Sequence, residues 1–329
     1  MEITKIFKKI DKKFASHCFR DLKFNSKDCR YGDIFFVIKG ANQNGNLFIN
    51  EAIKNQAKTI ISDKKFEGFR DDVLFLYNKN PRELLAKTAS KIYSKKPNNL
   101  IAVTGTNGKS SIVNFFYQIM KLNKKPVSSI GTLGIVTNKK NIQTNNTTLD
   151  SVTLNKFLAK LKINKINNVI LEASSHGLKQ HRLDGLKFDL GIFTNLSRDH
   201  LDYHKSYKDY LNSKLILFKH LMKKNAKIVF DNDIEQSKLI KKICAKKKIK
   251  SLTIGKNNSD LKLLDHKYIG HKQKVTFSYK NKIYYFETNL IGKIQINNLF
   301  MAILAALESK IQFKKIINCI NKIKSINGR

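Results

Sequence analysis

Long apolar runs are missing from this sequence of 329 residues. No uninterrupted apolar stretch reaches the roughly 18 residues that a membrane-spanning helix needs. The first thirteen residues are charged and lack the apolar core of a secretory signal. These absences predict a cytoplasmic protein without a membrane partner.

Cysteine is also scarce. The four cysteines, Cys18, Cys29, Cys244 and Cys319, lie far apart, and no CxxC pair occurs. A disulfide framework or a zinc site would need closer and more regular spacing. We therefore expect four reduced thiols.

Acidic residues are few as well, with 25 Asp and Glu against 63 Lys and Arg, a net charge of +38. Such a charge suggests a nucleic-acid partner. However, only seven of the basic residues are arginine, whose planar fork suits base and phosphate recognition. The lysines are spread along the whole chain, and tryptophan is absent. We attribute the charge to composition bias with solvated lysine faces and predict no nucleic-acid partner, although it would help to steer polyanionic substrates.

The length favours two domains. Residues 1–96 alternate short apolar runs (34–38, 59–61 and 73–76) with polar breaks, which predicts buried strands between short helices. The polar stretch 93–99 contains one of only three prolines and is predicted to be a linker. The first domain is thus expected to be a small α/β domain over residues 1–96.

Strand-like and helix-like segments alternate over residues 97–329, which predicts a mostly parallel sheet covered by helices. Residues 274–279 and 283–288 predict a late hairpin. The expected strands are Leu100–Val103, Val169–Leu171, Leu190–Phe193 and Lys227–Phe230, and the expected helices are Ser110–Leu122, Tyr207–Met222 and Ile234–Lys247.

A glycine-rich loop follows the first of these strands and leads into an amphipathic helix, which is the context of a phosphate-binding loop. Its glycines allow backbone N–H groups to face phosphate oxygens, and the helix N-terminus adds a favourable dipole. Lys109 is predicted to reach the β- and γ-phosphates of ATP, and the Ser110 hydroxyl to bind Mg²⁺. The predicted ATP-binding residues are Gly105, Thr106, Asn107, Gly108, Lys109, Ser110 and Ser111.

Three later residues form a second predicted cluster. Glu172 and His200 each follow an apolar strand, at the edge where ligands of α/β sheets gather. Lys214 shares a helix face with Tyr210 and Phe218, so it is expected to point inward. Each has a structural alternative: an acid can cap a helix, a loop histidine can be a hydrogen-bonded structural residue, and a lysine can extend to solvent. Their joint occurrence after the loop favours a functional site.

The loop string TGTNGKS (104–110) resembles that of the Mur ligases and folylpolyglutamate synthetases. The strings EASSHGLKQHR (172–182) and FTNLSRDHLDYH (193–204) resemble the Mur ligases that make UDP-N-acetylmuramoyl-tripeptide, and separate the chain from the folate branch. The resemblance implies a central P-loop ATPase domain over residues 97–329. It also implies that Lys109, Glu172, His200 and Lys214 are catalytic.

The same resemblance implies two Mg²⁺ ions bridged by Glu172, with Ser110 on one and His200 on the other. It implies that Lys214 is carbamylated and supports the second metal ion. Carbamylation needs a neutral amine, and burial beside aromatic rings would lower the pKa of Lys214 in the required direction.

The nucleotide-sugar side is implied by shorter strings. Residues 25–35 resemble a uridine-binding string, but Asn25 and Lys27 replace Asp and Arg, so only Ser26 is carried over. The loop 41–43 corresponds to another uridine contact or is a polar turn. Asn298 is expected to meet adenine, although Gln295 replaces the family's Asn. The remaining substrate-binding residues implied are Asn146, Thr147, Thr148, Ser174, Gln180 and Arg182.

The implied activity is ATP-dependent addition of diaminopimelate or lysine to UDP-N-acetylmuramoyl-L-alanyl-D-glutamate, by a monomer. The family's third, amino-acid-binding domain is expected to be absent, because that domain follows a Gly-Arg pair and the sequence stops at one. Three alternatives remain: a sister Mur ligase acting at another step, a nucleotide-binding fragment without turnover, and a nucleic-acid-binding protein.

Overall fold

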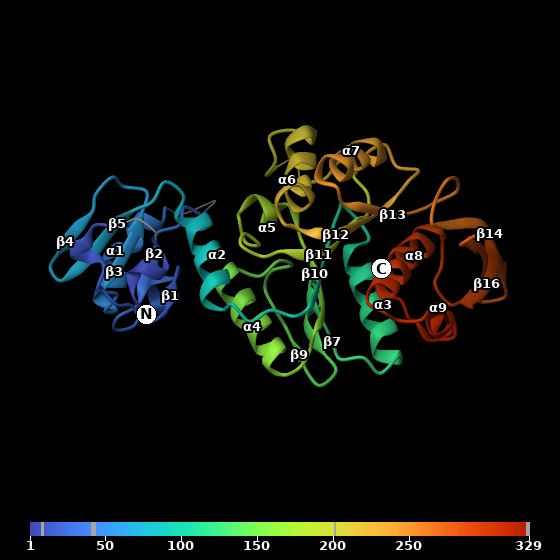
Figure 1. Ribbon diagram of the computed structural model, residues 1–329, viewed down its shortest axis with the longest axis horizontal. Helices are drawn as coiled ribbons and strands as arrows, with labels where there is room; N and C mark the ends of the chain where they lie inside the picture. The colour runs from blue at the N-terminus through green and yellow to red at the C-terminus, as the bar shows by residue number, and fades with distance from the viewer. Residues whose placement is uncertain (8–9, 41–43, 201, 327–329) are drawn as a thin grey trace. The chain divides into compact units, whose positions relative to one another are not determined.

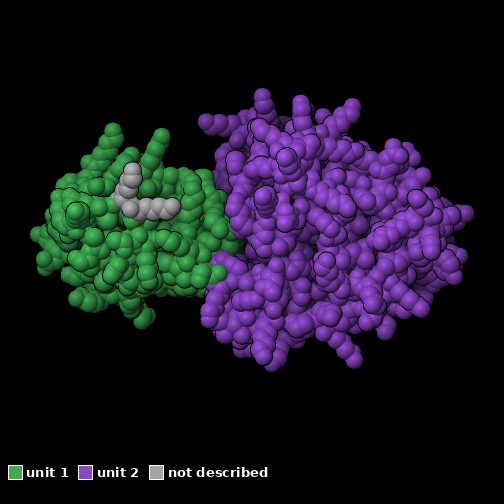
Figure 2. Space-filling model, in the orientation of Figure 1, with its two compact units in different colours: residues 1–94, 150–157, 180–186 green, residues 95–149, 158–179, 187–329 purple. Residues whose placement is uncertain are grey.

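The computed structural model describes residues 1–7, 10–40, 44–200 and 202–326 (Figure 1). The predicted loop 41–43 lies outside the described residues. By contacts the chain divides into two compact units (Figure 2). Unit 1 comprises residues 1–94, 150–157 and 180–186, and unit 2 comprises residues 95–149, 158–179 and 187–329.

Unit 1 is built on a five-stranded sheet with the order β1-β2-β3-β5-β4, parallel except for the β4–β5 pair. The side chain of Asn80 accepts a hydrogen bond from the Glu83 backbone N–H, and Pro81 follows it, so helix α2 begins at a strong capping signal. The elements are β1 (Leu22–Lys23), β2 (Ile34–Phe36), α1 (Ile49–Lys54), β3 (Thr59–Ser62), β4 (Gly68–Arg70), β5 (Val73–Tyr77) and α2 (Pro81–Ile92).

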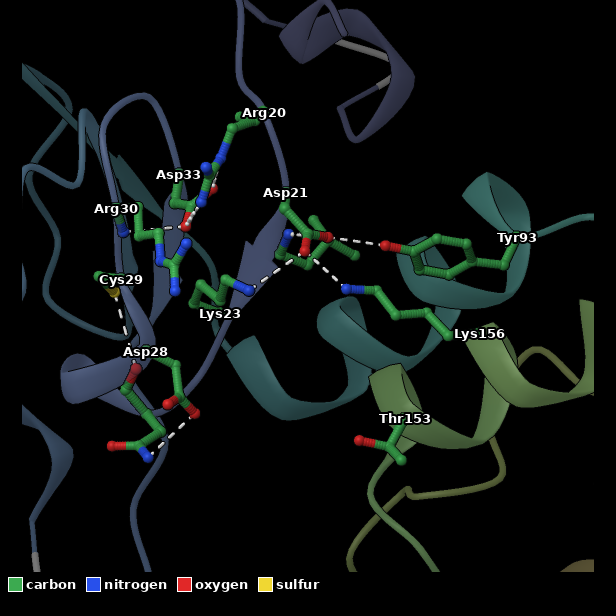
Figure 3. A network of polar contacts seen from close by, with 12 residues as sticks. Arg20, Asp21, Lys23, Asp28, Cys29, Arg30, Asp33, Tyr93, Thr153 and Lys156 are labelled. Carbon is green, nitrogen blue, oxygen red and sulfur yellow. Dashed lines mark hydrogen bonds and ion pairs between the residues drawn. The ribbon is translucent and has the colours of Figure 1, made fainter. Parts of the chain in front are cut away.

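A polar network braces the first strands of unit 1 (Figure 3). Asp33, which is fully buried, accepts two hydrogen bonds from the Arg20 guanidinium, at 2.8 and 2.9 Å. Asp21 accepts from Lys156 at 2.6 Å and from the Tyr93 hydroxyl at 2.7 Å. Burial alone would raise the pKa of Asp21, but these hydrogen bonds hold it well below its usual range.

Unit 2 contains, within the described residues, an 11-stranded sheet with the order β16-β15-β14-β13-β12-β11-β6-β10-β7-β8-β9. Neighbouring strands from β14 to β7 pair in parallel, and antiparallel strands extend both ends. The strands are β6 (Asn99–Thr104), β7 (Val127–Gly131), β8 (Gly134–Thr137), β9 (Asn141–Ile142), β10 (Asn168–Glu172), β11 (Phe188–Phe193), β12 (Met222–Asp231), β13 (Lys250–Gly255), β14 (Leu261–Ile269), β15 (Lys272–Tyr279) and β16 (Lys282–Thr288).

Helices cover both faces of this sheet, with α6 and α7 on one side and α3 and α8 on the other (Figure 1). Helix α8 is apolar from Leu299 to Leu307, and it packs against α3 and the central strands to form the main core of unit 2. The helices are α3 (Lys109–Leu122), α4 (Ser151–Ile163), α5 (Ser175–Lys179), α6 (Tyr207–His220), α7 (Ser237–Lys247), α8 (Lys293–Glu308) and α9 (Phe313–Ile317).

The predicted α/β class and mostly parallel sheet are confirmed, and each predicted strand of residues 97–329 lies within an observed one. Two helix boundaries were wrong. The helix expected to reach Met222 ends at His220, because Met222 already pairs as the first residue of β12. The helix expected from Ile234 begins at Ser237. The predicted hairpin is also part of a three-stranded meander that includes β14.

Cysteine side chains differ in exposure. Cys18 is exposed, whereas Cys29, Cys244 and Cys319 are buried, and all four are free thiols. Burial raises the pKa of Cys29 to about 12 and that of Cys244 to about 11. None of the helices in the described ranges is both long and apolar enough to span a membrane.

Candidate active site

The glycine-rich loop joins β6 to α3, and two of its glycines are required by their surroundings. Gly105 has φ +149°, and a Cβ there would lie 1.8 Å from the Thr194 hydroxyl oxygen. Gly108 has φ +84°, and a Cβ there would lie 2.4 Å from Oδ1 of Asn298. Asn298, the predicted adenine contact on α8, therefore lies directly against the loop.

Residues that follow β11 brace the loop. The Thr106 N–H donates to the backbone oxygen of Asn195 at 3.0 Å. The Asn107 N–H donates to the side-chain Oδ1 of Asn195, also at 3.0 Å. The Thr194 hydroxyl donates to the Asn107 carbonyl at 2.6 Å. Sequence reasoning did not single out Thr194 and Asn195, although both belong to the FTNL string that carries the resemblance.

Two lysines converge on one carbonyl oxygen of the loop. Lys109 Nζ lies 2.9 Å and Lys214 Nζ 2.7 Å from the Gly105 oxygen. Lys214 is 1% exposed, and its amine lies 4.1 Å from the centre of the Tyr210 ring. Burial, with a smaller effect of the Lys109 charge, lowers the pKa of Lys214 to about 6. The inward orientation predicted for Lys214 is confirmed by its burial.

A buried carboxylate lies beside the first turn of α3, the helix that follows the glycine-rich loop. Glu172, at the end of β10, is 2% exposed, and its Oε2 accepts from the Ser110 hydroxyl at 3.1 Å. Thr132 donates its N–H to Oε1 at 2.9 Å and its hydroxyl to Oε2 at 3.3 Å. Mg²⁺ prefers oxygen ligands such as hydroxyl and carboxylate groups, so Ser110 and Glu172 suit this ion. Thr132 had not been predicted, and no local signal marks it.

His200 lies in a group of aromatic side chains. Its backbone has φ +52°, and its ring centre lies 5.0 Å from that of His176 and 6.2 Å from that of Tyr210. The described residues hold no cluster of three His, Cys, Asp or Glu side chains that could bind a metal ion. The implied set contains only two such side chains, since Ser110 and a modified Lys214 supply the other ligands.

Three of the predicted substrate residues belong to the hydrogen-bond network that includes Glu172 and Thr132. The Thr148 hydroxyl donates to the Glu172 carbonyl at 2.9 Å and accepts from the Ser174 N–H at 2.9 Å. The Thr147 hydroxyl lies 3.3 Å from that of Thr132. Asn146 precedes them and is exposed.

The other predicted substrate residues belong to unit 1. Ser26 is 3% exposed and donates to Oε2 of Glu51 at 2.5 Å, beside a cavity of about 590 Å³ lined by Phe24, Phe35 and Phe48. This volume is in the range of small-molecule sites. In residues 180–186, the Arg182 guanidinium donates to the Gln180 oxygen at 2.9 and 3.1 Å.

Comparison with known proteins shows the family to which this chain is similar. Residues 103–306 match the family model of the Mur ligase middle domain. The UDP-N-acetylmuramoyl-L-alanyl-D-glutamate--2,6-diaminopimelate ligase of Rickettsia montanensis is 37% identical over 320 residues, covering 96% of this chain and 66% of that protein. The chain thus spans about two thirds of the length of this relative.

Solved structures of Mur ligases are also similar to this chain in fold. One of a ligase with the same name superposes with a TM-score of 0.88 at 26% identity, covering 100% of this chain and 68% of that one. A MurF ligase from Thermotoga maritima, solved in complex with ADP, has a TM-score of 0.67 at 23% identity, with coverage of 94% and 67%. The second likeness concerns the fold alone.

Proposed function

Because this chain belongs to the Mur ligase family, we propose that it forms the ATP- and UDP-sugar-binding part of an enzyme that extends a peptidoglycan precursor. The proposed reaction joins 2,6-diaminopimelate to UDP-N-acetylmuramoyl-L-alanyl-D-glutamate. The glutamate carboxylate attacks the γ-phosphate of ATP to give an acyl phosphate and ADP. The incoming amine then displaces phosphate and forms the amide. The protein is proposed to act as a cytoplasmic monomer without a nucleic-acid partner.

The observation that carries this proposal is the convergence of Lys109 and Lys214 on the Gly105 carbonyl. Two ammonium groups at one oxygen would repel each other, so one of them is favoured in its neutral form. Lys109 at the helix N-terminus is the cation suited to the ATP phosphates. The buried neutral amine of Lys214 is then available to react with CO₂, and the resulting carbamate would be an anionic ligand.

The side-chain oxygens of Ser110 and Glu172, beside the first turn of α3, suit Mg²⁺ as ligands. Ser110 and Glu172 would hold it, with His200 and carbamylated Lys214 supporting a second ion. When bound, Mg²⁺ would stabilise the charge of the transferring phosphoryl group. The backbone of residues 105–108 would bind the phosphates, with Ser111 at the first turn of α3, while Asn298 beside Gly108 would meet the adenine.

We assign the remaining predicted residues to the second substrate. The cavity beside Ser26 would hold the uridine end in unit 1. Thr147, Thr148 and Ser174 belong to the hydrogen-bond network of Glu172 and Thr132 and would contact the muramoyl-peptide end near the transferred phosphate. Asn146, Gln180 and Arg182 would complete the contacts to the peptide and pyrophosphate, because a guanidinium suits such anions.

Calorimetry tests this proposal on the chain itself. We expect ADP to bind with a strong dependence on Mg²⁺, and UDP-N-acetylmuramoyl-dipeptide to bind with micromolar affinity or better, on the order of −8 kcal/mol. A DNA duplex at moderate salt serves as the control for charge alone. Binding of DNA but of neither nucleotide would refute the ligase assignment.

A product assay by mass spectrometry distinguishes ligation from binding alone. Addition of 2,6-diaminopimelate or lysine, each with ATP and the dipeptide substrate, identifies the third amino acid. Nucleotide binding without product in a protein of the full family length would favour the alternative of a binding function without turnover.

A further inference from the structure

Among the ionisable side chains described in the loop between β11 and α6, that of His204 is the most deeply buried, with 1% of its surface exposed. Its backbone N–H donates to the His200 carbonyl at 3.0 Å. Its Nε2 lies 3.0 Å from the hydroxyl oxygen of Ser175, the first residue of α5. Its Nδ1 lies 3.4 Å from the hydroxyl oxygen of Ser213 on α6. One residue therefore connects three segments that are separate in the sequence.

The hydrogen-bond partners favour one tautomer of this ring. The Ser213 hydroxyl donates to the Asp209 carbonyl at 2.8 Å, so its hydrogen is not available to the imidazole. This favours the tautomer in which Nδ1 carries the proton and faces Ser213 and the Asp209 carboxylate, 3.6 Å away, and in which Nε2 accepts from Ser175. Burial, followed by the charge of Lys179, lowers the pKa of His204, in the direction that favours the neutral ring of this arrangement.

Each connected segment carries one of the groups assigned to the metal site. Ser175 follows Glu172 by three residues, Ser213 directly precedes Lys214, and His200 accepts the backbone hydrogen bond of His204. The His204 ring also packs against Tyr210, with ring centres 5.0 Å apart. The Tyr210 hydroxyl in turn lies 3.2 Å from that of Thr106 in the phosphate loop.

We propose that His204 is a positioning residue, which fixes Glu172 and Lys214 relative to each other through its side-chain hydrogen bonds to Ser175 and Ser213, next to His200, whose carbonyl accepts from its backbone N–H. The inference rests on the proposed function, because it assumes that those three groups serve one metal and phosphate site. Residues behind metal ligands commonly set the orientation of those ligands, and replacing them weakens metal affinity. A histidine with a purely structural role would stabilise the fold without affecting the metal dependence.

The substitution His204→Phe keeps a planar ring of similar size and removes both side-chain hydrogen bonds. ADP binding is measured by calorimetry on the chain across a Mg²⁺ titration, with the affinity in EDTA as the metal-independent baseline. We expect the Mg²⁺ midpoint to rise by about tenfold, as for other residues behind metal ligands, while the affinity in EDTA stays unchanged. A ¹³C NMR signal of a lysine carbamate, formed in ¹³C-bicarbonate, is expected to weaken in the same variant.

His266→Phe is the matched control. His266 lies on β14 in unit 2, and its Nδ1 is 2.6 Å from Nε2 of Gln273. This variant is expected to lower the melting temperature without moving the Mg²⁺ midpoint.

A wild-type Mg²⁺ midpoint in a folded His204→Phe variant would overturn the proposal. If that variant does not fold, Ser175→Ala, which removes only the Nε2 hydrogen bond, is judged by the same criterion. If the wild-type chain binds ADP with no dependence on Mg²⁺, the proposed function fails, and the positioning role fails with it.

Discussion

A single methyl group added at Gly131 is expected to disturb the candidate metal site although none of the proposed metal ligands is replaced. Gly131 ends β7, and a Cβ there would lie 2.3 Å from Oε1 and 2.6 Å from Cγ of Glu172. Its φ lies outside the left-handed region, so alanine meets no backbone strain. The effect of Gly131→Ala must therefore arise from displacement of the carboxylate.

The structure gives the size of the effect. Carbon and oxygen atoms in ordinary contact lie about 3.5 Å apart, so the Glu172 carboxylate must retreat by more than about 1 Å. At that distance it loses the 2.9 Å hydrogen bond from the Thr132 N–H. One hydrogen bond to a charged group contributes about 2 kcal/mol, which corresponds to a fall in melting temperature of about 4–8 °C for a unit of this size. We expect the Mg²⁺ midpoint for ADP binding to rise by about 10- to 100-fold.

The assays are differential scanning calorimetry and a Mg²⁺ titration of ADP binding. Gly270→Ala is the control, because Gly270 has φ +57° and a Cβ there would have no neighbour within 4 Å. That variant should lose about 1 kcal/mol through backbone strain and keep the wild-type Mg²⁺ midpoint. A Gly131→Ala protein with both the melting temperature and the Mg²⁺ midpoint of the wild type would refute the placement of Glu172.

Three further predictions concern other residues. Lys109→Ala is expected to reduce ATP affinity by at least about 100-fold with an unchanged circular dichroism spectrum, because the phosphates lose their cation; retained affinity would contradict the phosphate-loop assignment. Lys214→Ala is expected to abolish the ¹³C carbamate signal, and a surviving signal would show that another lysine carries it. The hydrogen bond to Asp184 raises the pKa of His181, so this pair stabilises the fold fully below the ordinary histidine pKa and ceases to do so as pH rises through the raised value. Asp184→Asn should therefore lower the urea midpoint near about pH 5.5 but not near about pH 9, and an equal loss at both would argue against this ion pair.

The sequence predicted those parts of the site that local patterns encode. The phosphate loop was found because strand, glycines, Lys109 and helix are contiguous. The burial of Lys214 was found because Tyr210 and Phe218 share its helix face.

Other contacts of the site depend on which strands are neighbours in the sheet, which local patterns do not encode. Thr132 reaches Glu172 only because β7 and β10 are neighbours, and Asn195 reaches the loop only because β11 lies beside β6. The segments 150–157 and 180–186 group with unit 1 through contacts with distant residues, such as Lys156 with Asp21. Strand β14 was missed because most of its residues after Leu263 are exposed and show no alternation.

The uneven exposure of the cysteines has a practical consequence for studying this molecule in solution. The thiolate is the form that reacts with maleimides and iodoacetamides, and burial keeps Cys29, Cys244 and Cys319 both covered and protonated at neutral pH. Cys18 is the one exposed thiol among the four. A thiol-specific fluorophore should therefore attach once per chain, on unit 1, and leave the nucleotide-binding unit unlabelled. This 329-residue chain thus offers a single-site spectroscopic reporter without any prior cysteine replacement.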